Sequence, residues 1–183
     1  MRLAIYAGHG GPDPGAVSGG LQEKDLNLAV SKAATVVLRQ RGYMVLNNRT
    51  VDVGRSITQD ANLANENRAD ALVEIHFNSN QGTPGTGSEA FISVREIGRS
   101  RELANAILAR IEALGFRNRG VKTQLNGRGQ DAFGILRLTS VPAVLLECAF
   151  INNRQDMARF SLSTMAQAIA DGVSEIYPLR VTE

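Results

Sequence analysis

Short runs rich in apolar residues alternate with longer amphipathic segments along most of this chain of 183 residues. The short runs predict strands at residues 3–6, 44–46, 71–75, 88–93 and 141–147. Apolar residues that recur every three or four positions predict helices at residues 24–41, 57–69, 98–114 and 154–176. We expect the strand at 88–93 to lie at an edge of the sheet, and residues 116–139 to form loops around one or two short strands. Strands that alternate with helices are typical of an α/β domain, so the pattern predicts a largely parallel sheet with helices on both faces.

The expected helices carry recognisable end signals. Ser56 and Gln59 fit a capping box at the start of the second helix. Gly42 and Gly115 follow the ends of the first and third helices, and Pro178 stops the last one. Because no internal repeat or linker interrupts this order, the sequence predicts a single domain.

The composition is that of an ordinary soluble domain, with 43% hydrophobic and 21% charged residues. No apolar run approaches the roughly 20 residues that cross a bilayer, so we expect no membrane insertion. The N-terminus leads into His9 without the apolar region of a signal peptide, so we expect synthesis in the cytoplasm without one. A net charge of +2 agrees with anionic surroundings such as a bacterial wall and does not suggest nucleic acid. Because Cys148 is the only cysteine, an internal disulfide and a four-cysteine zinc site are excluded.

Both histidines of the chain, His9 and His76, follow strand-like runs, and His9 lies within the glycine-rich stretch 8–15. Ligands of α/β sheets bind at the carboxyl ends of strands, so the two histidines are expected to share one site. Together with Glu23 they form a two-histidine, one-carboxylate set, which matches a zinc ion with one position left for water. The alternative for His9 is a turn residue whose ring is satisfied by a hydrogen bond.

Glu147 ends an apolar run that we expect to be a central strand. A buried carboxylate without a partner is costly, so Glu147 is either a general base with a raised pKa or the partner of an arginine such as Arg137. Cys148 follows it and is expected to point to the opposite face as a small buried residue. Arg117, Arg119 and Lys122 form a basic cluster, which we expect to be a solvated face; the alternative is contact with an anionic substrate.

Several motifs resemble, in the correct order, those of the zinc-dependent N-acetylmuramoyl-L-alanine amidases of the amidase-3 family. The motifs are Ala7–Gly11 with Asp13–Ala16, Glu23–Leu28, Asn48–Thr50 with Asp52, Ile75–Ser79 and Leu146–Asn153. The likeness extends from about Leu3 to Val173. It departs from the family at Tyr6-Ala7, where Asp-Pro is frequent, and at Glu74, where serine is frequent. Glu74 is therefore expected to alter the surroundings of His76 and with them the affinity for metal.

The resemblance implies a twisted, mixed sheet and cleavage of the amide between N-acetylmuramic acid and L-alanine of the peptidoglycan stem peptide. Carried over by position, His9, Glu23 and His76 would hold Zn²⁺, and Glu147 would be the catalytic carboxylate. Asn78, Arg128 and Gln130 are expected to contact the muropeptide. Residues 1–178 would be the catalytic domain and residues 179–183 a C-terminal tail.

The chain is further expected to be a monomer that acts on the bacterial cell wall after release or export, like a phage endolysin or an excised autolysin domain. We see no inserted helix that would cover the site, and so expect activity without an activator. Two alternatives remain open: a zinc endopeptidase or carboxypeptidase that acts on wall peptides, and a peptidoglycan-binding module without turnover.

Overall fold

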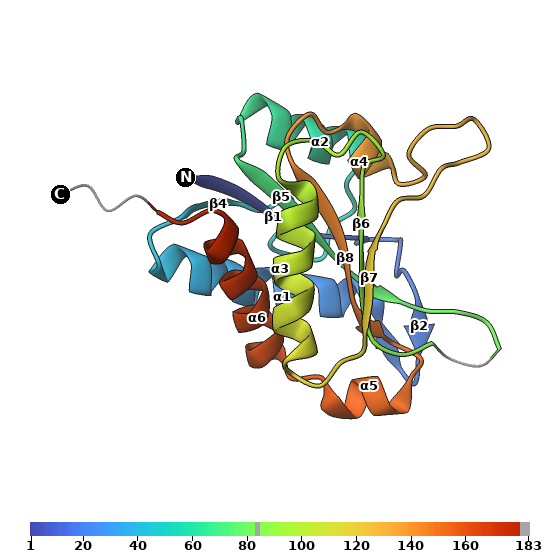
Figure 1. Cartoon of the computed structure of the whole chain (residues 1–183). Helices are drawn as coiled ribbons and strands as arrows, with labels where there is room; N and C mark the ends of the chain where they lie inside the picture. Colours follow the sequence, from blue (N-terminus) through green and yellow to red (C-terminus); the bar gives the residue numbers. More distant parts are fainter. Residues whose placement is uncertain (83–84, 180–183) are drawn as a thin grey trace.

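The centre of the molecule is a six-stranded sheet in the order β4-β1-β5-β8-β6-β7 (Figure 1). The computed structural model describes residues 1–82 and 85–179 of the chain. The strands are β4 (Met44–Leu46), β1 (Arg2–Ala7), β5 (Ala71–Asn78), β8 (Ala143–Phe150), β6 (Ser88–Ile92) and β7 (Asn118–Lys122). Neighbouring strands run parallel except β6 and β8, which are antiparallel. The prediction of a mostly parallel, mixed sheet is therefore confirmed.

Helices cover both faces of this sheet, as the alternation of strands and helices predicts (Figure 1). The helices are α1 (Glu23–Gln40), α2 (Ile57–Glu66), α3 (Ser100–Glu112), α4 (Gly134–Leu138), α5 (Arg154–Arg159) and α6 (Leu162–Ile176). Those on one face, α1, α3 and α6, share a core with Ile5 and Val73, whereas α2 and α4 pack with Ala4 and Leu72 on the other. The capping box of α2 is present, with the Ser56 side chain accepting from the Gln59 backbone N–H.

The alternation of side chains along β5 decides where its polar residues lie. Successive residues of a strand point to opposite faces. Val73 and Ile75 therefore join the core under α1, α3 and α6, while Leu72 joins the core under α2 and α4. Glu74 and His76 follow at the same spacing as Leu72, which places both on the α2 and α4 face near the carboxyl end of the strand.

The prediction that residues 88–93 form an edge strand is wrong. β6 lies between β8 and β7, and all of its residues are buried. The edge is β7, whose Asn-Arg-Gly-Val-Lys sequence lacks the apolar pattern that marks a strand. Its charged side chains suit an edge position, because charge on an edge strand discourages pairing with other chains.

The prediction of one helix over residues 154–176 is also wrong, because the chain forms α5 and α6 with a break between them. Phe160 has an extended backbone, with ψ of 126°, and its ring packs edge-to-face on Phe77. Asn153 caps α5 by accepting hydrogen bonds from the backbone N–H groups of Gln155 and Asp156. The extended residue Phe160 thus separates two helices in a segment for which the apolar spacing predicts one.

A short antiparallel hairpin leads into α1 and was not predicted. It consists of β2 (Val17–Ser18) and β3 (Leu21–Gln22), and it places Glu23 at the first position of the helix. Among the described residues, no helix combines the length and the apolar character that crossing a membrane requires. Only the first residue of the expected tail at 179–183 belongs to the described part of the chain, so that boundary stays a prediction.

Asp156 joins three segments near the carboxyl end of β8. Its side chain is fully buried and accepts hydrogen bonds from the Thr86 hydroxyl at 2.7 Å, from Gly87 N–H at 2.8 Å and from Phe150 N–H at 3.0 Å. The carboxylate thus connects the loop before β6, the end of β8 and the start of α5.

We expect Asp156→Ala to lower the free energy of unfolding by about 3 kcal/mol, because three donors, two of them in buried hydrogen bonds, lose their charged acceptor. Urea denaturation of both proteins measures the change. Glu102→Ala serves as the control, because its ion pair with Arg99 lies at the surface and its loss should leave the midpoint unchanged. Equal midpoint shifts in both variants would contradict the role assigned to Asp156.

Candidate functional site

The two histidines meet where β1 and β5 end side by side. β1 ends at Ala7, two residues before His9. Ala7 is paired in the parallel ladder with Ile75, the residue before His76 on β5. The rings are 5.0 Å apart between centroids and nearly perpendicular, at 81°. Gly8 allows this approach, because a Cβ atom there would lie 2.2 Å from Cε1 of His76.

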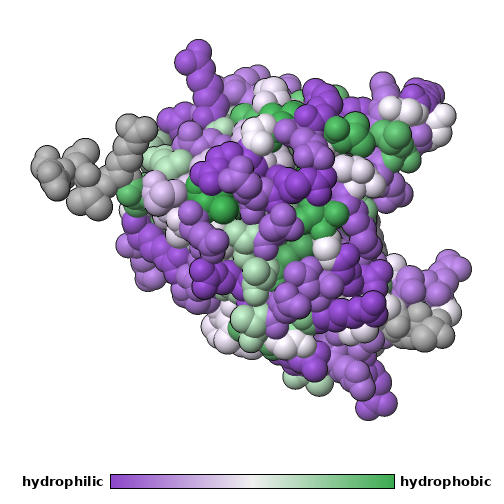
Figure 2. All heavy atoms as spheres, in the orientation of Figure 1, coloured by the Kyte–Doolittle hydropathy of each residue, from purple (hydrophilic) through white to green (hydrophobic). Residues whose placement is uncertain are grey.

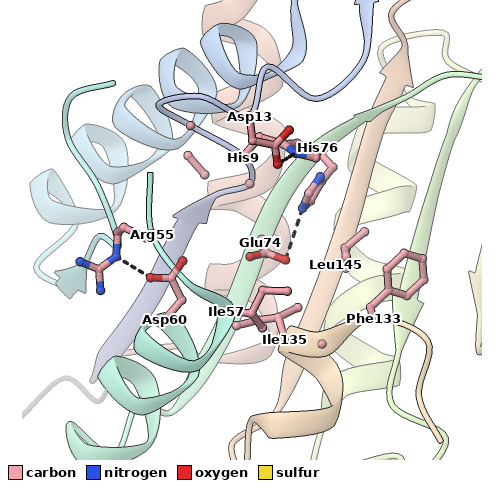
Figure 3. A pocket seen from close by; sticks show the side chains of 14 residues that line it. His9, Asp13, Arg55, Ile57, Asp60, Glu74, His76, Phe133, Ile135 and Leu145 are labelled. Atoms are coloured by element: carbon pink, nitrogen blue, oxygen red, sulfur yellow. Dashed lines mark hydrogen bonds and ion pairs between the residues drawn. The ribbon is translucent and has the colours of Figure 1, made fainter. Parts of the chain in front are cut away.

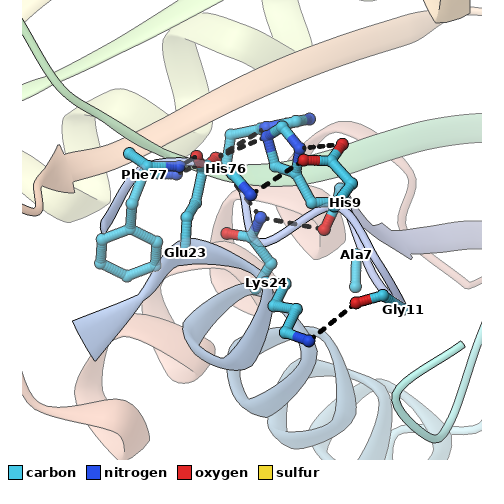
Figure 4. A network of polar contacts seen from close by, with 12 residues as sticks. Ala7, His9, Gly11, Glu23, Lys24, His76 and Phe77 are labelled. Carbon is cyan, nitrogen blue, oxygen red and sulfur yellow. Dashed lines mark hydrogen bonds and ion pairs between the residues drawn. The ribbon is translucent and has the colours of Figure 1, made fainter. Parts of the chain in front are cut away.

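Glu23 joins both histidines from the start of α1 (Figure 4). One oxygen, Oε1, lies 2.9 Å from His76 Nδ1 and 3.3 Å from His9 Nε2. The same oxygen accepts from Phe77 N–H at 3.1 Å, and Oε2 accepts from Ala16 N–H at 2.8 Å. One ligand atom from each of the three site residues lies within 4.8 Å of the others. The structure therefore brings the three predicted ligands together with spacing that suits a single metal ion.

The pKa values of Glu23, His9 and His76 shift in directions that favour an ionised carboxylate beside protonated imidazoles. Burial alone would raise the pKa of Glu23, but its contacts with His76 and His9 outweigh burial and hold the pKa well below its usual range. Conversely, hydrogen bonding to Glu23 raises the pKa of His9. Burial acts against a charged His76, yet Glu23 and Glu74 raise its pKa well above the ordinary value.

A second carboxylate faces the outer nitrogen of each imidazole. Asp13 Oδ2 lies 2.8 Å from His9 Nδ1, and Glu74 Oε2 lies 3.3 Å from His76 Nε2 (Figure 3). Carboxylates in this position fix the tautomer and orientation of metal-binding histidines. His9 Nε2 and His76 Nδ1 are thereby left to face Glu23, so the donor set fits a cation at its centre. Glu74, which departs from the family pattern, lies where it can orient His76.

Glu147 lies beside His76 on the next strand. β5 and β8 are paired in parallel, with His76 opposite Glu147. Its Oε2 atom is buried and has no hydrogen-bond partner, and burial raises the pKa of the carboxyl group to about 7. The alternative of an ion pair with Arg137 is not realised, since that guanidinium donates to the backbone oxygen of Asp131. Cys148 is buried on the opposite face, as predicted.

A cavity of about 340 Å³ opens over these four groups. His9, Glu23, His76 and Glu147 line it, together with Asn78, Ser79, Phe77, Ala16, Phe133 and Leu145. A second hollow of about 210 Å³ begins on the other side of the two histidines and reaches the Arg55–Asp60 ion pair (Figure 3). Glu147 and the three residues with clustered ligand atoms therefore line one space that a small polar group can enter.

Buried polar side chains hold the glycine-rich loop that carries His9. The Arg49 guanidinium donates to the backbone oxygens of Gly8 and Lys24, and Asn27 donates to the same Gly8 oxygen. Lys24 in turn donates to the backbone oxygen of Gly11. Residues of the motifs Glu23–Leu28 and Asn48–Thr50 thus fix the backbone of the loop that carries His9.

Glu89, which no sequence pattern marks as a site residue, lies next to Glu147. The antiparallel ladder between β6 and β8 places Glu89 opposite Glu147. Glu89 is buried and accepts hydrogen bonds from Arg119 Nε and Lys122 Nζ, both at 2.5 Å, and from Asn78 Nδ2 at 2.8 Å. Burial would raise its pKa, but Lys122 and Arg119 outweigh burial and lower it.

The expectation of a solvated basic face is therefore wrong for Arg119 and Lys122 and holds only for the exposed Arg117. Residues 119 and 122 would point to opposite faces of a regular strand. The register between β6 and β7 shifts at this point, and Gly120 has a positive φ of 83°. This bulge brings both cations to Glu89.

Of the three residues expected to contact substrate, only Asn78 lines the cavity. Arg128 and Gln130 lie in the exposed loop after β7, where their backbone N–H groups donate to the Asn126 side chain. The structure therefore separates these two residues from the four groups at the cavity.

Comparison with known proteins gives a consistent result. A family model described as N-acetylmuramoyl-L-alanine amidase matches residues 3–176. The chain is 34% identical over 181 residues to the N-acetylmuramoyl-L-alanine amidase LytC of Bacillus subtilis, covering 96% of this chain and 35% of LytC. It is 34% identical over 187 residues to the endolysin of Bacillus phage SPP1, covering 96% of this chain and 66% of the endolysin. The chain thus spans about a third of one relative and about two thirds of the other.

A solved structure shares nearly the whole fold. The catalytic domain of CwlV, an N-acetylmuramoyl-L-alanine amidase from Bacillus (Paenibacillus) polymyxa, superposes with a TM-score of 0.86 at 30% identity. The superposition covers 98% of this chain and 99% of that domain. The described residues therefore share their fold with the catalytic domain of CwlV.

The raised pKa of Glu147 gives a testable dependence of stability on pH for protein kept free of metal by a chelator. The folded pKa of about 7 lies above the ordinary value of 4.5, so the folded state binds this proton more tightly than the unfolded chain. The resulting stabilisation is complete below about pH 4.5 and is lost as the pH rises towards 7.

Glu147→Gln cannot ionise, so we expect it to exceed the wild type in stability by about 3 kcal/mol at pH 8 and to match it near pH 4. Urea denaturation at the two pH values measures this difference. A difference between the two proteins that is the same at both pH values would show that Glu147 does not titrate in the folded site as described.

Proposed function

Because this chain belongs to the N-acetylmuramoyl-L-alanine amidase family, we propose that it is a zinc-dependent peptidoglycan hydrolase that cleaves the amide between N-acetylmuramic acid and L-alanine. One observation carries the proposal. Ligand atoms of His9, Glu23 and His76 gather within 4.8 Å, next to the buried, unpartnered carboxylate oxygen of Glu147. The match over residues 3–176 also supports the proposal that residues 1–178 form the catalytic domain.

The donor set suits zinc better than it suits Mg²⁺ or Ca²⁺. Two imidazoles and one carboxylate form a ligand set typical of catalytic zinc, whereas Mg²⁺ and Ca²⁺ prefer oxygen ligands. His9 Nε2, His76 Nδ1 and Glu23 would hold the ion, and Asp13 and Glu74 would keep the imidazoles oriented. When bound, Zn²⁺ would polarise the scissile carbonyl and lower the pKa of a water molecule at its open position to about 7.

Glu147 is suited to move the proton that amide hydrolysis must transfer. Without a bound metal ion, burial raises its pKa to about 7, and a general base and acid is most effective when its pKa lies near the working pH. The carboxylate would accept a proton from the attacking water and then donate it to the amide nitrogen. The lactyl group of N-acetylmuramic acid would leave with a new carboxylate, and L-alanine with a free amino group.

The apolar walls of the cavity support this assignment. Phe133 and Leu145 line the space next to Glu147 and limit the number of water molecules around its carboxyl group. Limited hydration favours the neutral carboxylic acid and so keeps the pKa raised between the two proton transfers. Asn78 lies at the same wall, and we propose that its amide contacts the muropeptide.

Digestion of purified peptidoglycan tests the reaction. We expect free amino termini on L-alanine and intact glycan strands, identified by mass spectrometry, because only the muramoyl amide is cut. A zinc chelator should abolish the new termini, and zinc should restore them while magnesium should not. Termini within the stem peptide would instead indicate an endopeptidase or carboxypeptidase, and binding without new termini a module without turnover.

Removal of the proposed base should separate catalysis from metal binding. We expect Glu147→Ala to keep the fold and one zinc ion per chain but to lose activity by a factor of about 1,000, as is typical when a general base is removed. Steady-state kinetics and metal analysis of the purified protein measure the two properties. His76→Ala is the matched comparison, because it should lose both zinc and activity. Wild-type turnover in Glu147→Ala would show that Glu147 is not the general base.

A further inference from the structure

A row of ionisable side chains crosses the sheet from the metal ligands to its edge. Strand pairing places His76 on β5, Glu147 on β8 and Glu89 on β6 directly beside one another. Adjacent strands lie about 4.8 Å apart, so Glu89 is one strand spacing from the proposed base. Arg119 and Lys122 on β7 reach back over the next spacing to bind Glu89. Two fixed cations therefore end the row that begins at the metal ligands.

The two cations keep donors that nothing in the described chain uses. Arg119 binds Glu89 through Nε alone, and its two terminal nitrogens have no hydrogen-bond partner among the described residues. Lys122 Nζ makes one such bond, which leaves two N–H groups. The side chains remain 28% and 37% exposed, respectively. One carboxylate against two cations also leaves the cluster with a net charge of +1.

Aromatic rings hold both cations in place. The Arg119 guanidinium lies 5.0 Å from the centroid of the Phe150 ring, and Lys122 Nζ lies 5.9 Å from that of Phe91. The bulge at Gly120 turns both side chains to the same face of the sheet. Figure 2, in the orientation of Figure 1, shows a hollow in the surface on the side of the molecule where β7 lies, below the loop that follows β7. The free donors are therefore pre-oriented, which lowers the entropy cost of binding an anion.

From this geometry we propose that Arg119 and Lys122 form a subsite for a carboxylate of the stem peptide, on the residue that follows L-alanine. The proposal rests on the proposed function, because it places the scissile amide at Glu147. An extended chain advances about 3.3–3.6 Å per residue, so a carboxylate one residue beyond L-alanine lies within about 7 Å of the scissile nitrogen. That length matches the one to two strand spacings between Glu147 and the cations.

A carboxylate fits these donors better than a neutral group. The planar guanidinium offers parallel N–H groups that match the two oxygens of a carboxylate, and an ammonium group adds a second charged hydrogen bond. A carboxamide at the same position would keep one oxygen acceptor for one cation, but it would present an N–H₂ group to the other cation and would lack the negative charge. The subsite therefore selects a free acid over its amide.

Two muramoyl tripeptides that end in L-lysine test the subsite. They differ only at the α-carboxyl group of the second residue, which is free in one and a carboxamide in the other. We expect kcat/KM of the wild-type protein to be about tenfold or more higher for the free acid, because one charged hydrogen bond at a partly exposed site stabilises the complex by about that factor. Arg119→Ala and Lys122→Ala should each bring the preference towards one, mainly by raising KM for the acid.

The ratio within each variant is the decisive quantity, because a change at Glu147 or in folding affects both substrates alike. Arg117→Ala is the matched control: it removes an exposed cation from the same segment and should keep the wild-type preference. If one of the two subsite variants fails to fold, the other still reports the ratio. The subsite is overturned if the wild-type ratio of kcat/KM between acid and carboxamide is one, or if the preference for the acid survives both substitutions. In either case, cleavage of both peptides still supports the proposed amidase activity. If neither peptide is cleaved by zinc-loaded protein, the proposed function fails and the subsite falls with it.

Discussion

The need to compensate one buried carboxylate, Glu23, ties the helical layer to the sheet. It lies at the first position of α1 and is reached by two backbone N–H groups and two imidazole rings from different parts of the chain. An isolated buried carboxylate would cost several kcal/mol, so these partners must come together when the chain folds. The glycine-rich loop, the end of β5 and the start of α1 are therefore fixed relative to one another by the same interaction that gathers the proposed ligands.

Two neighbouring carboxylates of the sheet differ in pKa because their surroundings differ. Glu147 and Glu89 face each other across the β6–β8 ladder, and both are removed from water. Arg119 and Lys122 bind Glu89 and keep it ionised, whereas Glu147 has apolar neighbours and its pKa rises to about 7. Paired groups whose environments move their pKa values apart are typical of acid–base sites. The ionised Glu89 also adds to the rise at Glu147, so the cation cluster and the proposed base are coupled.

Sequence patterns predicted those features that depend on local order along the chain. The apolar runs gave the parallel strands, and the positions of His9 and His76 after two of them predicted a shared site, which the adjacent β1 and β5 produce. Sequence patterns did not predict the residues that join the site only through pairing between distant strands. Glu89 belongs to the site because it is paired with Glu147, some 60 positions away in the chain. Arg119 reaches Glu89 through a bulge, which the alternation of side chains along a regular strand does not predict. At the break before α6, Phe160 likewise packs on Phe77 of β5, which is far away in the sequence.

The backbone at His9 adopts the left-handed conformation, with φ of 60°, although the residue is not glycine. Side chains with a Cβ atom are disfavoured there by on the order of 1 kcal/mol. The glycines at positions 10 and 11 also have positive φ, at 136° and 57°. Glycine would fit position 9 with less strain but would supply no imidazole. The imidazole at position 9 thus lowers the stability of the loop. Such a loss of stability is common where natural selection retains a reactive group against the conformational preference of the chain.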